Sequence, residues 1–209
     1  MYTKVEEAIH FMVKAYKGQK RKNENIDASF HSMIVGMMIR NITYSEDVIV
    51  AAILHDIIED TSYDYDFLLN KFGKELADGV KNVSELKATG TWREKKEAFI
   101  TKLEVSSNEI LAVELADKLQ NLVSDYNLFI SNGSESLLTE SDSLDNFKWY
   151  YTKLQSIFNS RLERNELLNR YNNIIDLYFN NWTRNGYNII ETIKNSSFLI
   201  FKIKKVLQI

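Results

Sequence analysis

Four ionisable side chains stand close together in the stretch HDIIED, residues 55–60, directly after the apolar run VIVAAIL. If the helix predicted for 45–58 continues through this stretch, His55 shares a face with Glu59, and Asp56 shares one with Asp60. Burying imidazoles and carboxylates is costly unless a partner compensates their charge. The stretch therefore indicates a functional site or, as a structural alternative, a solvated acidic face or a capping cluster.

A second carboxylate lies in an equally apolar frame, in the stretch EILAVELADKLQNL. Asp117 and Asn121 are four residues apart, and Val113 rather than a cation stands four residues before Asp117. An isolated ionised carboxylate in such surroundings needs a cation nearby. That cation could be a metal ion, or a lysine or arginine from another helix.

The chain holds three histidines and no cysteine. His31 opens the apolar segment HSMIVGMMI, whereas His10 lies beside the apolar stripe of the first helix and is expected to be a core or surface residue. Two imidazoles and two carboxylates from three helices would form a mixed site that suits manganese, iron or zinc better than magnesium or calcium. The lack of cysteine excludes thiolate ligands and disulfides, and fits a reducing compartment.

The elements that must position these residues are helices. The 209 residues are 44% hydrophobic and include no proline and only seven glycines, which predicts one all-α domain. Apolar residues three and four apart mark a first helix from Val5 to Tyr16. Further helices are predicted at 31–41, 45–58, 64–71, 73–82, 92–105, 107–124, 143–162 and 165–182, with polar loops at 18–29 and 131–136.

Charge and hydropathy exclude several partners. A net charge of -3 and a pI near 5.7 give no footprint for nucleic acid, and no run reaches the length of a membrane span. The start MYTKVEEAIHF lacks an export signal, so a cytoplasmic location without membrane contact is expected. Residues 185–209 are apolar and basic, and are expected to pack on the domain at 1–184 or at an oligomer contact, in a monomer or a homodimer.

His31, HDIIEDT at 55–61 and LADKLQNL around Asp117 resemble the HD-domain metal-dependent phosphohydrolases. More narrowly, they resemble the alarmone-hydrolase domain of RelA/SpoT-type proteins and the small alarmone hydrolases. The likeness covers roughly residues 5–126, including AYKGQKRK and FGKELADGVKNVSELK, and extends to about residue 160 through DNFKWYYTKLQSIF. It implies a single HD-domain helical bundle with additional C-terminal helices.

The resemblance also implies roles for the residues that match the family's motifs. One divalent metal, typically manganese, would be held by His31, His55, Asp56 and Asp117. Glu59 and Asp60 match the acidic pair that orients and deprotonates the attacking water.

The basic loop KGQKRK gains a role from the same resemblance. Arg21 and Lys22 would line the nucleotide pocket, and Asn121 would contact the nucleotide. Without that context, such a loop is typical of a solvated turn. In LADKLQNL, Lys118 and Gln120 stand where the family usually has arginine and histidine.

The implied substrate is a guanosine nucleotide with a 3′-diphosphate, ppGpp or pppGpp, which would be hydrolysed to GDP or GTP plus pyrophosphate. Two alternatives stay open. The chain could be an HD-domain phosphohydrolase that acts on other nucleotides, or a catalytically degenerate HD domain that senses nucleotides.

Overall fold

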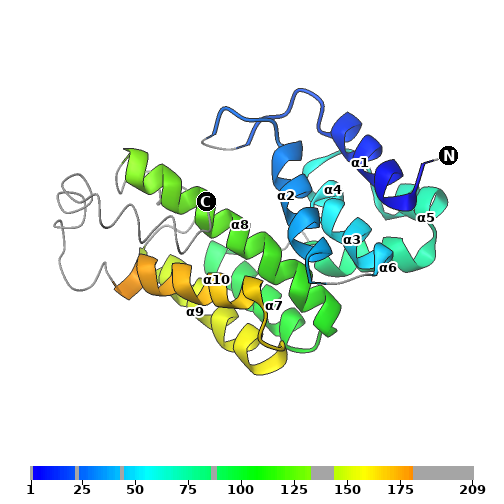
Figure 1. The fold of residues 1–209 in the computed structure, drawn as a ribbon. Helices are drawn as coiled ribbons and strands as arrows, with labels where there is room; N and C mark the ends of the chain where they lie inside the picture. The colour runs from blue at the N-terminus through cyan, green and yellow to red at the C-terminus, as the bar shows by residue number, and fades with distance from the viewer. Residues whose placement is uncertain (1, 22–23, 43–44, 86–88, 133–143, 181–209) are drawn as a thin grey trace.

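The fold is helical, as the sequence predicts (Figure 1). The computed structural model describes residues 2–21, 24–42, 45–85, 89–132 and 144–180. Within these ranges the only β-type pairing is an isolated bridge between Lys20 and Asp27, so the all-α prediction is confirmed.

The helices follow the predicted order, with small shifts at most of their ends. They are α1 (Lys4–Ala15), α2 (Ser29–Arg40), α3 (Glu46–Ile53), α4 (Ile57–Asp60), α5 (Tyr65–Phe72), α6 (Lys74–Val83), α7 (Trp92–Glu104), α8 (Asn108–Asn132), α9 (Leu144–Arg161) and α10 (Glu166–Ile175), which continues as a π-helical turn (Asp176–Asn180). The helix predicted for 107–124 runs further than expected, because α8 extends into the predicted loop at 131–136.

The continuous helix predicted for 45–58 is wrong. Helix α3 ends at Ile53, and α4 begins only at Ile57, so His55 and Asp56 lie in a turn between them. In an unbroken helix the Ala52 carbonyl would accept a hydrogen bond from the Asp56 N–H. Here it accepts one from Nδ1 of His55 at 2.8 Å, so a side chain competes with the helix ladder. The four ionisable groups therefore do not share one helical edge.

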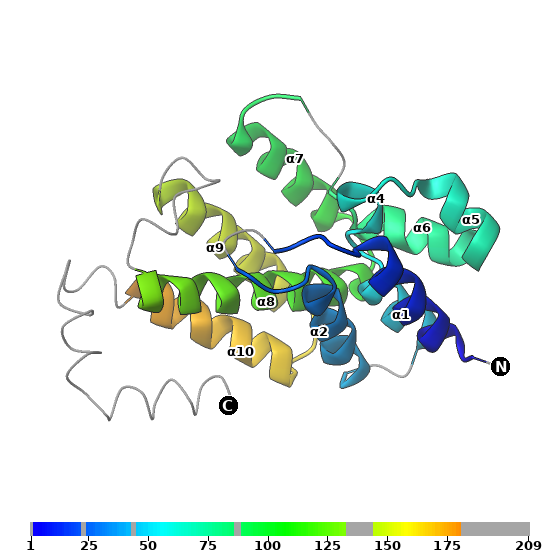
Figure 2. The same ribbon diagram turned by 90° about the horizontal axis from the view of Figure 1, so that it is seen from above.

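Helix α8 lies at the centre of the bundle, where it contacts α2, α3 and α6 on one side and α9 and α10 on the other (Figures 1 and 2). Leu111, Leu115, Leu119 and Leu122 of this helix are fully buried. Asp117 lies among them along the helix and is buried as well.

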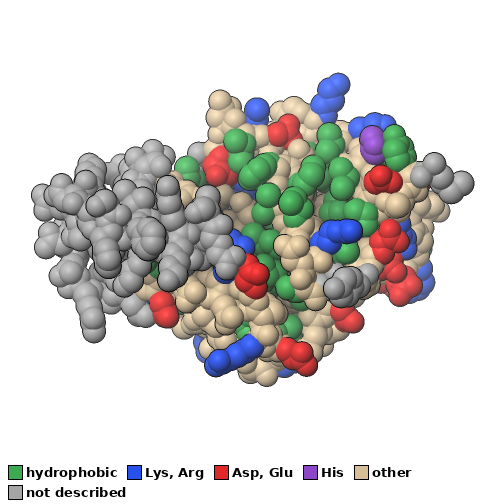
Figure 3. All heavy atoms as spheres, in the orientation of Figure 1, with side chains coloured by type: hydrophobic (Ala, Val, Ile, Leu, Met, Phe, Trp, Pro, Cys, Tyr) green, Lys and Arg blue, Asp and Glu red, His purple; other side chains and the backbone are tan. Residues whose placement is uncertain are grey.

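Helix α2 separates a buried face from an apolar outer face. His31, Val35 and Ile39 point into the core, whereas Phe30 and Met37 are 49% and 59% exposed. Hydrophobic side chains gather over this helix in Figure 3. Among the described residues, no helix is both long and apolar enough to cross a membrane. The extension predicted at 185–209 lies outside the described residues.

Helices α2 and α3 pack closely at Gly36, and this contact gives a prediction. A Cβ on Gly36 would overlap Cγ1 of Ile53 and lie 3.3 Å from its Cδ1. We expect Gly36→Ala to lower the free energy of unfolding by about 1–3 kcal/mol in urea denaturation, because this core cannot take the added methyl group.

Gly79→Ala is the matched control, since a Cβ there would lie an ordinary 3.7 Å from Cβ of Ala51. Alanine is the better helix former by about 1 kcal/mol, so this variant should be as stable as the wild type or more stable. Equal stability of the Gly36→Ala variant and the wild type would contradict the close approach of the two helices.

Candidate metal centre

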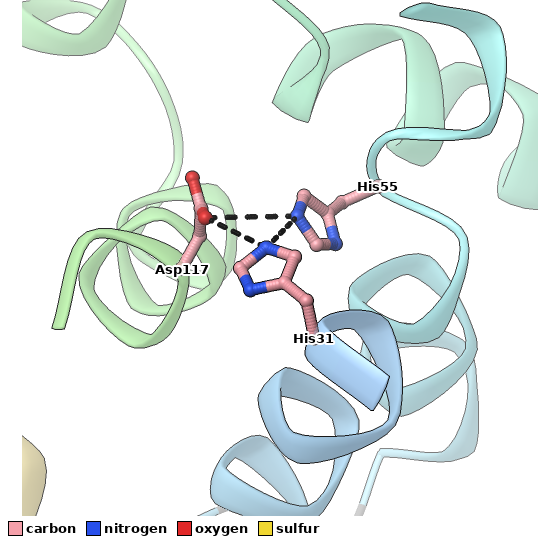
Figure 4. A group of neighbouring side chains, drawn as sticks. All are labelled: His31, His55 and Asp117. Atoms are coloured by element: carbon pink, nitrogen blue, oxygen red, sulfur yellow. Dashed lines mark hydrogen bonds and ion pairs between the residues drawn. The ribbon is translucent and has the colours of Figure 1, made fainter. Parts of the chain in front are cut away.

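Three separate segments bring histidine and aspartate side chains to one point. His31 comes from the first turn of α2, His55 from the turn before α4, and Asp117 from the middle of α8. Figure 4 shows the three side chains pointing toward one another. Among the described residues they form the group of three that could hold a metal ion, and all three are buried.

The distances in this cluster fit the coordination shell of one cation. Nε2 of His31 lies 3.1 Å from Nε2 of His55 and 3.1 Å from Oδ1 of Asp117. Oδ2 of Asp56 lies 3.0 Å from Nε2 of His55 and 3.5 Å from Nε2 of His31. Two donor atoms that are each about 2.1 Å from one cation and subtend a right angle lie about 3 Å apart. The Asp56 side chain is 25% exposed, so the cluster is open to solvent on that side.

Hydrogen bonds to the outer ring nitrogens decide which atoms face the centre. Nδ1 of His55 bonds to the Ala52 carbonyl, which can only accept, so this nitrogen carries the proton. Nδ1 of His31 bonds to Oε1 of Gln120, also an acceptor. When both rings are neutral, two bare Nε2 lone pairs therefore face each other and the carboxylates, and this arrangement calls for a cation.

The pKa values of the cluster show the same demand for positive charge. Burial disfavours the charged form of His55, but Asp56 and Asp117 raise its pKa well above the ordinary value. The pKa of Asp117 is held well below its usual range: burial opposes this shift, and Lys118 and the histidines outweigh burial. A divalent metal would take the place of the imidazolium proton in this negative surrounding.

Asp117 also has a lysine partner. As the alternative to a metal, the sequence predicted a lysine or arginine from another helix. The structure shows Lys118, its neighbour on α8, donating to Oδ2 at 2.6 Å, with Glu114 3.5 Å from the same ammonium group. Oδ1 is the oxygen that faces the two histidines. The lysine therefore holds one oxygen while the other stays directed into the cluster.

The acidic pair expected to act on water lies on α4, one turn beyond Asp56. Glu59 accepts a hydrogen bond from the backbone N–H of Glu85. Burial, assisted by the charge of Asp56, raises the pKa of Glu59 to about 8. The same two causes, in the same order, raise the pKa of Asp60. Both carboxyl groups therefore hold protons more readily than surface acids.

The basic loop reaches α8 beside the cluster. Nη2 of Arg21 donates to Oδ1 of Asn121 at 3.0 Å, and Nδ2 of Asn121 donates to Oδ1 of Asp117 at 2.6 Å. The Arg21 side chain is only 19% exposed, which differs from a solvated turn. Lys22 lies outside the described residues. His10 is exposed and lies beside Tyr2, away from the cluster, as expected.

Several polar neighbours of the cluster were not predicted as site residues. They are Glu24, Gln120 and Ser124, which contact Arg21, His31 or each other. The spacing of positions 117, 120, 121 and 124 was the available signal, because residues three, four and seven apart share one helical face.

Comparisons with known proteins identify the family and the fold. A family model described as HD domain matches residues 8–127. The probable GTP diphosphokinase RSH2, chloroplastic, of Arabidopsis thaliana is 31% identical over 147 residues, which are 70% of this chain and 18% of that protein. The bifunctional (p)ppGpp synthase/hydrolase SpoT of Escherichia coli K12 is 30% identical over 114 residues, 52% of this chain and 16% of the relative. The chain thus spans only a small part of these curated relatives.

Two solved structures share the fold. One is described as a metazoan ortholog of SpoT that hydrolyzes ppGpp, with a TM-score of 0.68, 21% identity, and coverage of 86% of this chain and 97% of the other. The second is lmo0812 from Listeria monocytogenes EGD-e, with a TM-score of 0.62, 27% identity, and coverage of 72% and 94%.

Fold and site together define an all-helical domain with a histidine and aspartate cluster that could hold a metal. The family match covers more than half of the sequence, and the chain belongs to the HD-domain family.

Metal binding should stabilise the protein through Asp117. An ion at 100 times its Kd adds about 2.7 kcal/mol to the free energy of unfolding. For a chain of this size that corresponds to a rise in Tm of roughly 5–10 °C. We expect Mn²⁺ to give this rise in the wild type and none in Asp117→Asn, measured by differential scanning calorimetry after removal of metal with a chelator.

Asp47→Asn provides the control for loss of one carboxylate, since Asp47 pairs with Lys4 on the surface. This variant should keep the full Mn²⁺ shift. A shift in Asp117→Asn as large as that of the wild type would place the metal elsewhere.

Proposed function

We propose that this protein is a metal-dependent phosphohydrolase that removes the 3′-diphosphate of guanosine alarmones, converting ppGpp or pppGpp to GDP or GTP plus pyrophosphate. The observation that carries the proposal is the acidic pair of Glu59 and Asp60 on α4, directly after the His55 and Asp56 turn. The E. coli relative bears hydrolysis of (p)ppGpp in its name, which supports this choice of substrate.

One divalent cation belongs to the proposal, held by His31, His55, Asp56 and Asp117. Manganese is the proposed ion, because the resemblance to the alarmone hydrolases implies it. Two imidazoles and two carboxylates suit a transition metal better than magnesium or calcium. When bound, the ion polarises a phosphoryl oxygen and lowers the pKa of water beside it.

Glu59 and Asp60 supply the base in this reaction. The oxygen of a water forms a bond to the phosphorus attached to the 3′ oxygen, and the bond from that phosphorus to the 3′ oxygen breaks. The water proton passes to the acidic pair, and the 3′ oxygen keeps the bonding electron pair and takes up a proton. Burial raises the pKa of Glu59 to about 8, which makes its carboxylate a stronger proton acceptor than a surface acid once it is ionised.

Arg21, Lys22 and Asn121 form the proposed nucleotide contacts. Arginine can pair with a phosphate through two N–H groups or stack on a purine ring. Arg21 donates to Asn121, which in turn donates to the proposed ligand Asp117, and this chain of contacts supports a role for Arg21 in binding the nucleotide.

The experiment that tests the proposal compares two substrates on the manganese-loaded protein. GDP and pyrophosphate from ppGpp, with GTP left intact, are the expected products by anion exchange and pyrophosphate assay. Hydrolysis of GTP would favour an HD-domain phosphohydrolase for other nucleotides, and turnover of neither would favour a nucleotide sensor.

The cytoplasmic location and the monomeric or homodimeric state stay predictions from the sequence.

Loss of the base should separate metal binding from turnover. Glu59→Gln keeps an oxygen that can accept from the Glu85 N–H but loses the basic carboxylate. We expect kcat to fall by about 10²- to 10⁴-fold with Mn²⁺ affinity retained. The same substitution at exposed Glu97, which pairs with Arg93, should leave turnover unchanged. Full activity of Glu59→Gln would remove Glu59 from the mechanism.

Loss of the arginine should act on substrate binding. Charged hydrogen bonds contribute about 1.5–3 kcal/mol, so Arg21→Ala should raise KM for ppGpp by about 10- to 100-fold and change kcat much less. Lys17→Ala removes an exposed charge from the same loop and serves as the control. If Arg21→Ala shows the kinetics of the wild type, the loop has no part in recognition.

A further inference from the structure

A closed ring of hydrogen bonds and one close polar contact joins the basic loop to two of the proposed metal ligands. Each member contacts the next through a side-chain nitrogen or oxygen. In order around the ring, the seven members are His31, Gln120, Ser124, Glu24, Arg21, Asn121 and Asp117, which returns to His31. We call this set the ligand ring.

One arm of the ligand ring starts at the outer nitrogen of His31. Nδ1 of His31 donates to Oε1 of Gln120, whose Nε2 donates to Oγ of Ser124 at 3.3 Å. The Ser124 hydroxyl then donates to Oε1 of Glu24 at 3.0 Å. His31, Gln120 and Ser124 are all buried, so water does not compete freely for these bonds.

The other arm starts at the second oxygen of the same glutamate. Oε2 of Glu24 accepts from Nε of Arg21 at 3.0 Å, and Nη2 of Arg21 donates to Asn121 at 3.0 Å. Asn121 donates in turn to Oδ1 of Asp117, which lies 3.1 Å from Nε2 of His31. Glu24 is therefore the point where the two arms meet, with one carboxylate oxygen for each.

The direction of each bond is fixed by chemistry. A carboxylate can only accept and a guanidinium can only donate, so Ser124 must give its one hydroxyl proton to Glu24. The Ser124 oxygen is then an acceptor for the amide of Gln120, which turns the Gln120 oxygen toward the N–H of His31. In a neutral His31 ring, this order puts the proton on Nδ1 and directs Nε2 into the cluster.

Backbone hydrogen bonds of the loop hold Arg21 and Glu24 in place. The Arg21 N–H donates to the Ile26 carbonyl at 3.0 Å, and the Glu24 N–H donates to the Arg21 carbonyl at 3.3 Å. The loop therefore presents both side chains to α8 as one unit.

We propose that Gln120, Ser124 and Glu24 are positioning residues that fix Arg21 over the site and make metal binding depend on this loop. None of the three is a proposed ligand or base. Because Arg21 is the proposed substrate contact, the substrate part of this inference rests on the proposed function; the effect on metal affinity does not.

Ser124→Ala is the sharpest test, since it removes both Ser124 contacts of the first arm and so cuts that arm off from Glu24 without changing any charge. We expect Mn²⁺ affinity, measured by calorimetric titration of the metal-free protein, to fall by about tenfold, as for other residues that orient metal ligands. KM for ppGpp should rise several-fold, with kcat changed by less than about twofold, because the arginine is misplaced while the base is intact.

Ser106→Ala is the matched control, because in the described part of the chain the Ser106 hydroxyl donates to the Lys102 carbonyl, four residues earlier, and to no other group. It should keep the Mn²⁺ affinity and the KM of the wild type. If Ser124→Ala binds Mn²⁺ as tightly as Ser106→Ala does, the ligand ring transmits nothing and the proposal is wrong.

Glu24→Gln supplies a second test that does not depend on the folding of the first variant. It should also weaken Mn²⁺ binding. The double variant Glu24→Gln/Ser124→Ala should bind Mn²⁺ about as tightly as the single variant with the lower affinity, since both substitutions act on the same connection between Ser124 and Glu24. Fully additive losses would mean that Glu24 acts only through its distant charge, which would overturn the proposal. The Mn²⁺ titration uses no nucleotide, so it decides this inference even if ppGpp is not hydrolysed.

Discussion

Two imidazole nitrogens and two carboxylate oxygens face one another inside the bundle. Their close approach is electrostatically unfavourable without a cation, and the surrounding helices hold these four groups in place. Nε2 of His31 and Nε2 of His55 are 3.1 Å apart, closer than two bare lone pairs would remain without a positive charge between or beside them. Helix α8 supplies Asp117 from its buried part, and Gly36 lets α2, which carries His31, pack closely against Ile53 of α3. A cation bound here would therefore stabilise the fold as well as serve the chemistry of the site.

At the break between α3 and α4, a side-chain hydrogen bond within the site replaces a backbone hydrogen bond of the helix. The Ala52 carbonyl takes the N–H of the His55 ring in place of a backbone donor, which orients the ring and ends the helix at once. The same turn places Asp56 at the start of α4, so its carboxylate reaches the histidines while Glu59 and Asp60 follow on the new helix. The hydrogen bond between the His55 ring and the Ala52 carbonyl thus accompanies a turn that carries two proposed ligands, while the proposed base lies on the next helix.

The sequence predicted most of the helices, because apolar residues three and four apart reflect burial on one face, and α1, α5, α6, α7 and α9 follow that pattern closely. It also indicated the site, since His31, His55 and Asp117 are polar groups in apolar frames. The break at His55 could not be predicted from periodicity, because it depends on a competition between a side chain and the helix ladder. The contacts of Arg21 with Asn121 and of Ser124 with Glu24 join positions far apart in the chain, which no local pattern reports. Lys118, which stands where the family usually has arginine, holds one oxygen of Asp117, a contact that the sequence pattern does not report.

The proposed site holds one cation among His31, His55, Asp56 and Asp117. A crystal structure of the manganese-loaded protein, with diffraction data collected on both sides of the manganese absorption edge, would locate this ion. We expect one anomalous peak at about 2.0–2.3 Å from Nε2 of both histidines and from a carboxylate oxygen of each aspartate. A strong peak at another position, or no peak with the four side chains in the same arrangement, would contradict it.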